Sequence, residues 1–86
     1  MPELSRFYGI VIKLYFDDHP PSHFHAQYGG KEAVVSIETL GVIEGKLPPR
    51  AMGLVTEWAL LHQDELRDRW ARASALEAVE KIDPLL

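Results

Sequence analysis

Gly29-Gly30 lies between two stretches in which apolar and polar residues alternate, and this arrangement predicts a β-hairpin over residues 23–28 and 31–38. Glycine readily adopts the positive φ angles that a two-residue hairpin turn requires. Such a turn pairs Phe24 with Val35, Ala26 with Ala33, Tyr28 with Lys31, His25 with Val34 and His23 with Ser36. Because side chains alternate between the two faces of a strand, this register brings the apolar faces of both strands together. The opposite face of the hairpin is then expected to carry His23 and His25.

Two further segments extend this hairpin into a meander. Residues 6–16 are expected to form a strand, because their even positions carry large apolar side chains: Tyr8, Ile10, Ile12, Leu14 and Phe16. If Phe16 lies across from Phe24, the facing pairs are Tyr15 with His25, Lys13 with Gln27 and Asp17 with His23. Residues 41–45 are a candidate fourth strand, and residues 78–86 are a candidate short edge strand that ends at Pro84.

Residues 47–73 are predicted to form one long helix. Pro48 and Pro49 suit its first turn, where a missing N–H is tolerated. An apolar stripe recurs at helical spacing along it: Val55, Trp58, Ala59, His62, Leu66 and Trp70. We therefore predict a single α+β domain, residues 1–86, in which a small antiparallel β-meander of three to four strands carries one long helix on one face. With one helix available, the histidine-bearing face is open to solvent or covered by another molecule.

The composition narrows the classes of function. The chain has 86 residues, no cysteine and a formal net charge of −4, so a disulfide framework, a thiolate metal site and a cysteine nucleophile are excluded. A DNA-binding protein needs a basic footprint. The one basic cluster, Arg67, Arg69 and Arg72, alternates with acidic residues, so DNA is not an expected partner. No apolar run approaches the roughly 20 residues of a membrane-spanning helix. No signal-peptide pattern is present either, so we expect a cytoplasmic protein.

Residues 16–30, FDDHPPSHFHAQYGG, hold three of the four histidines and suggest three kinds of site. The first is a metal site. His23 and His25 are two residues apart on one strand face, so both imidazoles can reach one ion, and zinc needs at least one more ligand. His19 is the third candidate metal ligand, with Asp17 and Glu38 as alternatives. The sequence requires no cofactor, and a divalent metal such as zinc is the one that this pattern allows.

The second kind is an acid/base site. The candidate catalytic residues are His23, His25, Asp17 and Tyr15, which would lie on neighbouring strands within reach of one another. A carboxylate beside an imidazole favours the imidazolium and moves its titration toward working pH. Two histidines in different surroundings can then serve as base and acid in RNA cleavage, with or without a metal.

The third kind is a binding surface. Val11, Tyr15 and Val34 lie among the histidines, and exposed apolar groups on an open sheet face are typical of partner contacts. The candidate binding residues are His19, Asp18, Ser36 and Glu38. A purely structural role, with His23 bonded to Asp17, is the alternative to all three kinds of site.

Several short motifs occur together at fixed spacing: Phe7-Tyr8-Gly9-Ile10, Tyr15, Asp18-His19, His23-Phe24-His25, Tyr28, Gly45-Lys46-Leu47-Pro48, Trp58, Glu65-Leu66 and Trp70. In this combination the chain resembles a bacterial domain-of-unknown-function family, number 4160, from about Ser5 to the final IDPLL. The chain has Ser22 where that family usually has proline. The resemblance implies a small bacterial cytosolic protein encoded beside another short gene, in pairs that look like toxin–antitoxin modules. It carries over no catalytic residues.

These observations predict a small cytosolic partner-binding protein that is one component of a toxin–antitoxin-like two-gene module. The expected partner is the product of the neighbouring gene, a second copy of the chain bound through the open sheet face, or both. The alternative is a histidine-dependent hydrolase that acts on RNA, and RNA is then its partner.

Overall fold

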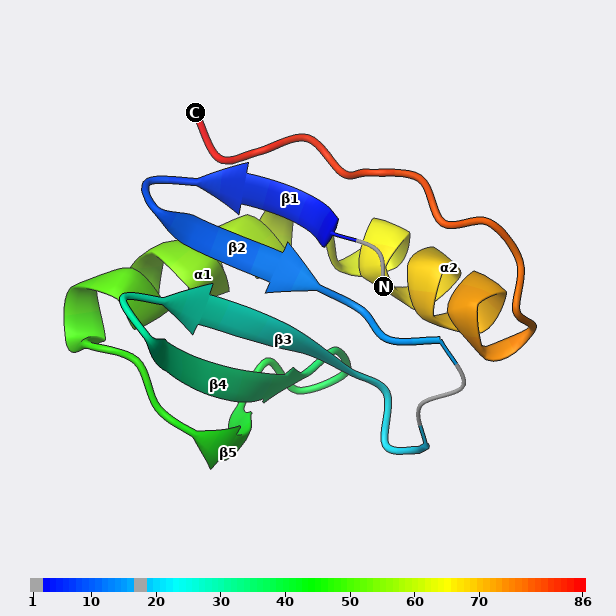
Figure 1. Cartoon of the computed structure of the whole chain (residues 1–86), viewed down its shortest axis with the longest axis horizontal. Helices are drawn as coiled ribbons and strands as arrows, with labels where there is room; N and C mark the ends of the chain where they lie inside the picture. Colours follow the sequence, from blue (N-terminus) through cyan, green and yellow to red (C-terminus); the bar gives the residue numbers. More distant parts are fainter. Residues whose placement is uncertain (1–2, 17–18) are drawn as a thin grey trace.

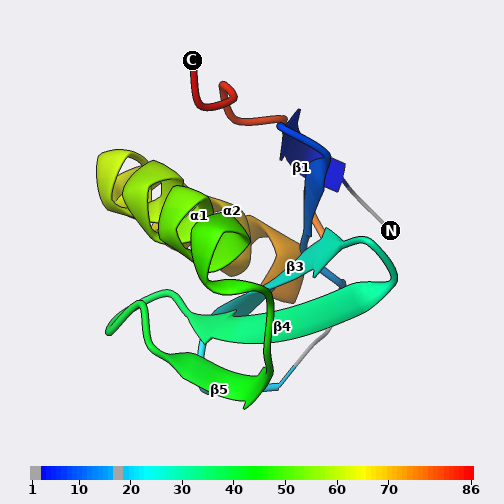
Figure 2. The same ribbon diagram turned by 90° about the vertical axis from the view of Figure 1, so that its left-hand side faces the viewer.

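The computed structural model describes residues 3–16 and 19–86. Its elements, in chain order, are β1 (Glu3–Phe7), β2 (Ile10–Lys13), β3 (His23–Tyr28), β4 (Lys31–Ser36), β5 (Val42–Gly45), α1 (Pro49–Leu61) and α2 (Gln63–Ser74). Each strand pairs antiparallel with the next, in the order β1-β2-β3-β4-β5 (Figure 1). Both helices lie on one face of this sheet (Figure 2). The predicted α+β class is confirmed, and the expected three to four strands and one helix are corrected to five strands and two helices.

The central hairpin has the predicted register. His23 pairs with Ser36, His25 with Val34, and Tyr28 with Lys31 across the Gly29-Gly30 turn. Gly29 and Gly30 have φ of 54° and 79°, the positive values that the two-residue turn was predicted to require. The candidate fourth strand is also confirmed, because β5 pairs with β4.

Residues 6–16 do not form one continuous strand. The chain turns at Tyr8-Gly9, where φ is 50° and 80°, so that Phe7 pairs with Ile10 and β1 and β2 form a second hairpin. Of the even positions predicted to be buried, Tyr8 and Phe16 are exposed, and the three between them are buried. Gly9 carried the only local signal, because a glycine inside a strand pattern often marks an interruption. Tyrosine before it is not a usual residue for such a turn.

β2 pairs with β3 two residues away from the predicted register. Lys13 lies opposite His25, whereas the prediction placed Tyr15 there. A shift by two residues keeps every side chain on its own face, so the alternating pattern does not distinguish the two registers. The predicted pairing of Asp17 with His23 lies outside the described residues.

The predicted long helix is divided at His62, where φ is −122° and ψ is 22°. The Gln63 side chain donates hydrogen bonds to the backbone carbonyls of Ile37, at 2.7 Å, and Glu38, at 3.1 Å. His62 Nδ1 lies 2.6 Å from Glu65 Oε1. The two Gln63 hydrogen bonds tie the start of α2 to the segment after β4. The junction holds neither proline nor glycine, the residues that usually signal a bend. Within the described residues, neither helix is long and apolar enough to cross a membrane.

The core lies between the sheet and the helices. From the first half of the chain, its fully buried side chains are Leu4, Ile10, Ile12, Leu14, Phe24, Ala26, Ala33, Val35 and Ile37. The buried members of the predicted helical stripe are Val55, Trp58, Ala59 and Leu66. The Trp58 ring lies at the centre, with its centroid 5.5 Å from that of Phe7 and 5.9 Å from that of Phe24. The stripe therefore covers the predicted face of the sheet.

The tail after α2 is not a strand, contrary to the candidate edge strand at residues 78–86. It runs beside β1 (Figure 1), where the Ile82 N–H donates to the Leu4 carbonyl at 2.8 Å. Ile82 is buried, and the Trp58 Nε1–H donates to the Asp83 carbonyl at 2.8 Å. The tail is thus held by one buried side chain and isolated hydrogen bonds rather than by a ladder, and it covers the outer edge of β1.

Candidate functional site

The face of the sheet that points away from the helices carries the predicted site. We call it the open face and define it by the side chains that strand pairing places there, together with Tyr15 just beyond β2: Arg6, Val11, Lys13, Tyr15, His23, His25, Gln27, Glu32, Val34, Ser36 and Glu44. His23 and Ser36 are buried, and the others are partly or fully exposed. With both helices on the other side (Figure 2), this face is covered by neither of them.

Three histidines gather at one end of the open face, and we call His19, His23 and His25 the histidine cluster. The ring centroids of His23 and His25 are 5.3 Å apart, and those of His19 and His23 are 6.5 Å apart. His23 and His25 occupy alternate positions of β3, and His19 lies in the loop before that strand. The structure therefore brings together the three histidines that the sequence singled out.

His23 is the most enclosed member of the cluster. Its Nδ1 lies 2.7 Å from the Pro21 carbonyl oxygen, and because a carbonyl only accepts, Nδ1 carries the proton. Its ring centroid lies 5.1 Å from that of Trp70, on α2. No β2 residue pairs with His23, so at this end of the sheet a helix side chain reaches the open-face side. The predicted helical stripe, which covers the opposite face of the sheet, includes Trp70. The prediction did not include the contact between Trp70 and His23.

His25 lies nearer the middle of the open face. The Tyr15 ring meets it edge-on, with centroids 4.4 Å apart. His25 Nδ1 is 3.5 Å from Glu32 Oε1, and the other Glu32 oxygen accepts a 2.8 Å hydrogen bond from Gln27. The predicted proximity of Tyr15 and His25 is thus present, although it arises from neighbouring positions rather than from direct pairing.

Two shallow pockets meet at the histidine cluster. One, of about 220 Å³, is lined by His19, Pro20, Pro21, His23, His25, Val34, Ile43 and Glu44. The other, of about 380 Å³, is lined by His25, Glu32, Val34, Glu44 and Gly45. The exposed His19 imidazole and the Glu32 and Glu44 carboxylates of these walls can exchange protons with a bound group, and Val34 and Ile43 offer apolar contact. The arrangement suits either acid/base chemistry or the binding of a partner's side chains.

The remaining candidate residues have separate surroundings. Ser36 pairs with His23, but it is buried, and its hydroxyl accepts a hydrogen bond from the Thr39 N–H at 3.2 Å. Glu38 is not part of the cluster, because it lies beyond β4 and its carboxylate binds Arg67 of α2 at 3.1 Å. The prediction placed Glu38 on the histidine face by continuing the alternation past Ser36, where β4 ends. Asp17 and Asp18 lie outside the described residues.

The candidate metal site has no complete ligand set in the part of the chain that the structure describes. No group of three or more histidine, aspartate or glutamate side chains there is placed to hold a metal ion. A zinc site needs at least three protein ligands.

The basic cluster on α2 is neutralised by acidic neighbours. Hydrogen bonds from Arg72 and, more weakly, from Arg69 lower the pKa of the Asp68 carboxyl. The hydrogen bond to Glu38 raises the pKa of Arg67. The reading of residues 67–72 as a solvated helix face, rather than a nucleic-acid surface, agrees with these pairings.

Sequence reasoning missed several residues that shape the site. Glu32 and Glu44 border the pockets, and Pro21 and Trp70 enclose His23. Glu32 carried a usable signal, because the correct hairpin register places it diagonally from His25. Trp70 carried none, since its position depends on the bend at His62.

A family model described as Domain of unknown function (DUF4160) matches residues 9–71 of the 86-residue chain. The matched range runs from the turn before β2 into α2, and it includes the whole histidine cluster and most of the open face. Comparison with curated proteins and with solved structures finds no match.

Proposed function

The chain belongs to the family described as Domain of unknown function (DUF4160), and from this premise we propose that it acts by binding a partner protein through the open face. The partner is the product of a neighbouring gene, in a bacterial two-gene module of the toxin–antitoxin-like kind that the family resemblance implies. Such a role fits a cytosolic protein. A second copy of the chain is the other occupant that the experiment below must separate from this partner.

The observation that carries the proposal is the apolar and aromatic character of a sheet face that neither helix covers. Val11 and Val34 are partly exposed on it, and Tyr15 borders the histidine cluster. Ile43 of the neighbouring edge strand is 47% exposed and shares a pocket with Val34. Contiguous apolar surface of this kind is typical of an interaction site.

Polar groups on the same face would supply specificity. Lys13, Glu32 and Glu44 carry charges, and the exposed His19 imidazole can donate and accept hydrogen bonds. Protein interfaces combine an apolar centre with polar groups toward the rim. The open face has both components within the span of the sheet.

Co-purification of the untagged chain with its tagged gene neighbour tests this proposal. Val34→Lys places a charge in the middle of the open face, and Leu61→Lys places the same charge on an exposed position of α1. We expect Val34→Lys to abolish co-purification and Leu61→Lys to preserve it, with both variants folded by circular dichroism. If Leu61→Lys alone abolishes binding, the open face is not the interface. Gel filtration of the chain without its neighbour reports whether a second copy occupies the face instead.

A hydrolase that acts on RNA is the second candidate, and one observation favours it: the three clustered histidines and Glu44 line a single pocket. His23 is held by Pro21 and Trp70. Both ring nitrogens of His25 are buried, so the exposed His19 is the group of this cluster that would transfer protons to a substrate. Such catalysis requires general acid and base groups within hydrogen-bond reach of the substrate.

Incubation of the purified chain with total RNA tests this second candidate. We expect cleavage by wild type, loss of cleavage in His19→Gln, and unchanged cleavage in His62→Gln, which removes an imidazole from the junction between α1 and α2. Parallel reactions with a chelator report whether a metal takes part. Growth of cells expressing wild type or His23→Ala/His25→Ala links the chemistry to toxicity. Intact RNA in every reaction would leave partner binding as the function.

A further inference from the structure

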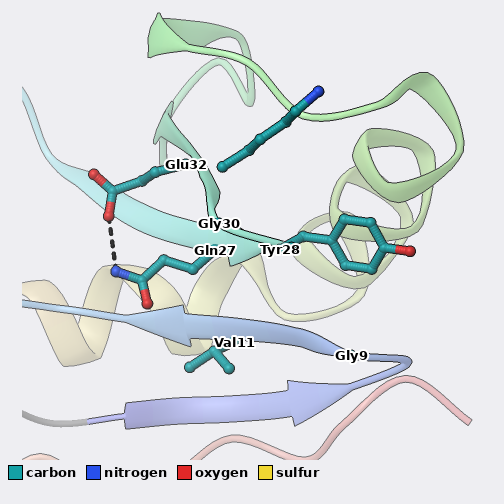
Figure 3. Close-up of a pocket in the computed structure, with 8 residues that line it drawn as sticks. Gly9, Val11, Gln27, Tyr28, Gly30 and Glu32 are labelled. Atoms are coloured by element: carbon teal, nitrogen blue, oxygen red, sulfur yellow. Dashed lines mark hydrogen bonds between the residues drawn. The ribbon is translucent and has the colours of Figure 1, made fainter.

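Two hollows lie at the other end of the sheet from the histidine cluster, where the turns of both hairpins approach the start of α1. The larger, of about 510 Å³, includes Tyr28, Lys31 and Glu32 in its walls (Figure 3). The smaller, of about 240 Å³, includes Tyr8, Tyr28 and Arg50 beside apolar residues of α1. Tyr28 belongs to both hollows. We call Tyr8, Tyr28, Lys31 and Arg50 the hairpin-end set.

Tyr8 occupies a backbone position that suits glycine or asparagine. It is the first residue of the two-residue turn, with φ of 50°, and it is 59% exposed. Turns of this kind select Asn, Asp or Gly, and a bulky residue with positive φ is uncommon. Neither the turn nor the core therefore explains a tyrosine here. A residue that opposes the local preference points to a role in binding.

Tyr28 lies directly over the same turn. Its Cε1 atom is 3.4 Å from the position that a Cβ on Gly9 would occupy, so its ring rests over the glycine that follows Tyr8. Within the described residues, no ring contact joins Tyr8 and Tyr28, although both line the smaller hollow. The two phenol rings thus present separate aromatic surfaces at one end of the sheet.

Each hollow also contains a cation that forms no ion pair with the described residues. In the described part of the chain, Arg50 forms no ion pair, whereas the other four arginines, Arg6, Arg67, Arg69 and Arg72, all do. Lys31 forms none with the described residues either, as is true of the other lysines. Both side chains are exposed. The carboxylate in the larger hollow, Glu32, is engaged by Gln27 at the opposite end from the Tyr28 ring (Figure 3).

We infer that the hairpin end binds single-stranded nucleic acid, with bases stacked on Tyr8 and Tyr28 and phosphates on Arg50 and Lys31. Exposed aromatic rings beside unpaired cations are the two components of single-strand recognition. Stacking is available here because the rings are accessible, and phosphate contact is available because no described carboxylate pairs with either cation. The site is separate from the open-face histidines and adds to the proposed function rather than resting on it.

The acidic character of the whole chain limits the electrostatic part of this binding. With a net charge of −4, the surface does not attract nucleic acid at long range, and two cations allow about two phosphate contacts. The logarithm of the binding constant should then fall with the logarithm of salt concentration with a slope of about −1.4, at about 0.7 per phosphate for single strands. Stacking rather than charge would supply most of the affinity.

Fluorescence anisotropy with a labelled uridylate decamer at low salt tests the inference. Tyr8→Asn is the decisive variant, because asparagine suits the turn and is expected to keep or raise the thermal midpoint. We expect it to weaken binding by about fivefold or more, the loss of one stacked base. Arg50→Gln and Lys31→Gln should each weaken binding and reduce the salt slope by about 0.7. Lys81→Gln removes the same charge from the tail and should change neither.

Further arms identify the ligand. If a thymidylate decamer binds equally well, the site accepts single-stranded DNA and RNA alike. If it binds more weakly, the site prefers RNA. Competition by free uridine monophosphate at similar concentration would replace the inference with a mononucleotide site. No binding of the decamer by wild type, or wild-type affinity in Tyr8→Asn, would overturn it.

Discussion

At the scale of single residues, Gly45 at the end of β5 is a position that the fold requires to be glycine. Its φ is 71°, and a Cβ added there would overlap the backbone carbonyl oxygen of Glu32 on β4. We expect Gly45→Ala to lower the free energy of unfolding by more than about 1 kcal/mol, because both the positive φ and the overlap disfavour a side chain. Urea unfolding followed by circular dichroism measures the change.

Gly53→Ala is the matched control for this prediction. Gly53 lies inside α1, and a Cβ there would meet nothing within 4 Å. Alanine should therefore raise the free energy of unfolding by about 1 kcal/mol, the difference in helix propensity. Two substitutions of the same chemistry are thus expected to act in opposite directions, and equal effects would contradict the described environment of Gly45.

At the scale of secondary-structure elements, the ion pairs along α2 predict a dependence of stability on pH. Hydrogen bonds from Arg72 and Arg69 lower the pKa of Asp68 in the folded chain. A group whose pKa is lower in the folded state stabilises it above the ordinary carboxyl pKa, and this stabilisation is lost as the pH falls. We expect the thermal midpoint of wild type to fall as the pH is lowered, and that of Asp68→Asn to fall less steeply. Because these side chains are exposed, high salt should reduce the difference in acid sensitivity between wild type and Asp68→Asn.

The tail supports β1 through Ile82. This side chain is buried against the core, and its N–H bonds to Leu4. We expect Ile82→Ala to lower the free energy of unfolding by about 2–4 kcal/mol, the usual result of deleting a buried aliphatic side chain. Leu86→Ala removes a fully exposed leucine from the same tail and should change the free energy of unfolding by less than about 0.5 kcal/mol. A small effect of Ile82→Ala in urea unfolding would show that the tail is not part of the core.

The elements that sequence reasoning predicted well are those with a local chemical signal. Gly29-Gly30 determined the turn, and alternation on both sides then determined the register of β3 and β4. The turn at Tyr8-Gly9 was missed because tyrosine opposes it. The predicted β2–β3 register was wrong by two residues, a shift that keeps each side chain on its face and that alternation therefore does not detect. The bend at His62 depends on hydrogen bonds from Gln63 to a distant segment, and no helix pattern contains that information.

The candidate site shows the same limit. The proximity of His23 and His25 followed from their spacing on one strand, and the structure adds His19 and Tyr15 beside them. Trp70 and Glu44 come from elements whose placement depends on tertiary packing, so their contacts could not be read from spacing. Glu38 was assigned to the wrong side because the end of β4 is set by the turn at residues 37–39, not by alternation.

At the scale of the whole molecule, the two proposed surfaces lie along one strand. His23 begins β3 and Tyr28 ends it, so the histidine cluster and the hairpin-end set are about 17 Å apart at 3.3–3.4 Å per strand residue. They are not independent, however. Val11, Gln27 and Glu32 of the open face also line the larger hollow beside Tyr28. A protein seated across the open face would therefore cover one wall of the nucleic-acid site.

This overlap predicts competition between the two ligands. Saturating amounts of the partner should weaken binding of the uridylate decamer, and by reciprocity the decamer should weaken binding of the partner. Anisotropy titrations with and without partner measure the first effect. Val34→Lys, which is expected to lose the partner but keeps the hairpin-end set, should bind the decamer equally well in both titrations. A ternary complex with unchanged affinity would place the partner elsewhere on the molecule, whereas competition that persists in Val34→Lys would show that the partner binds the nucleic acid itself.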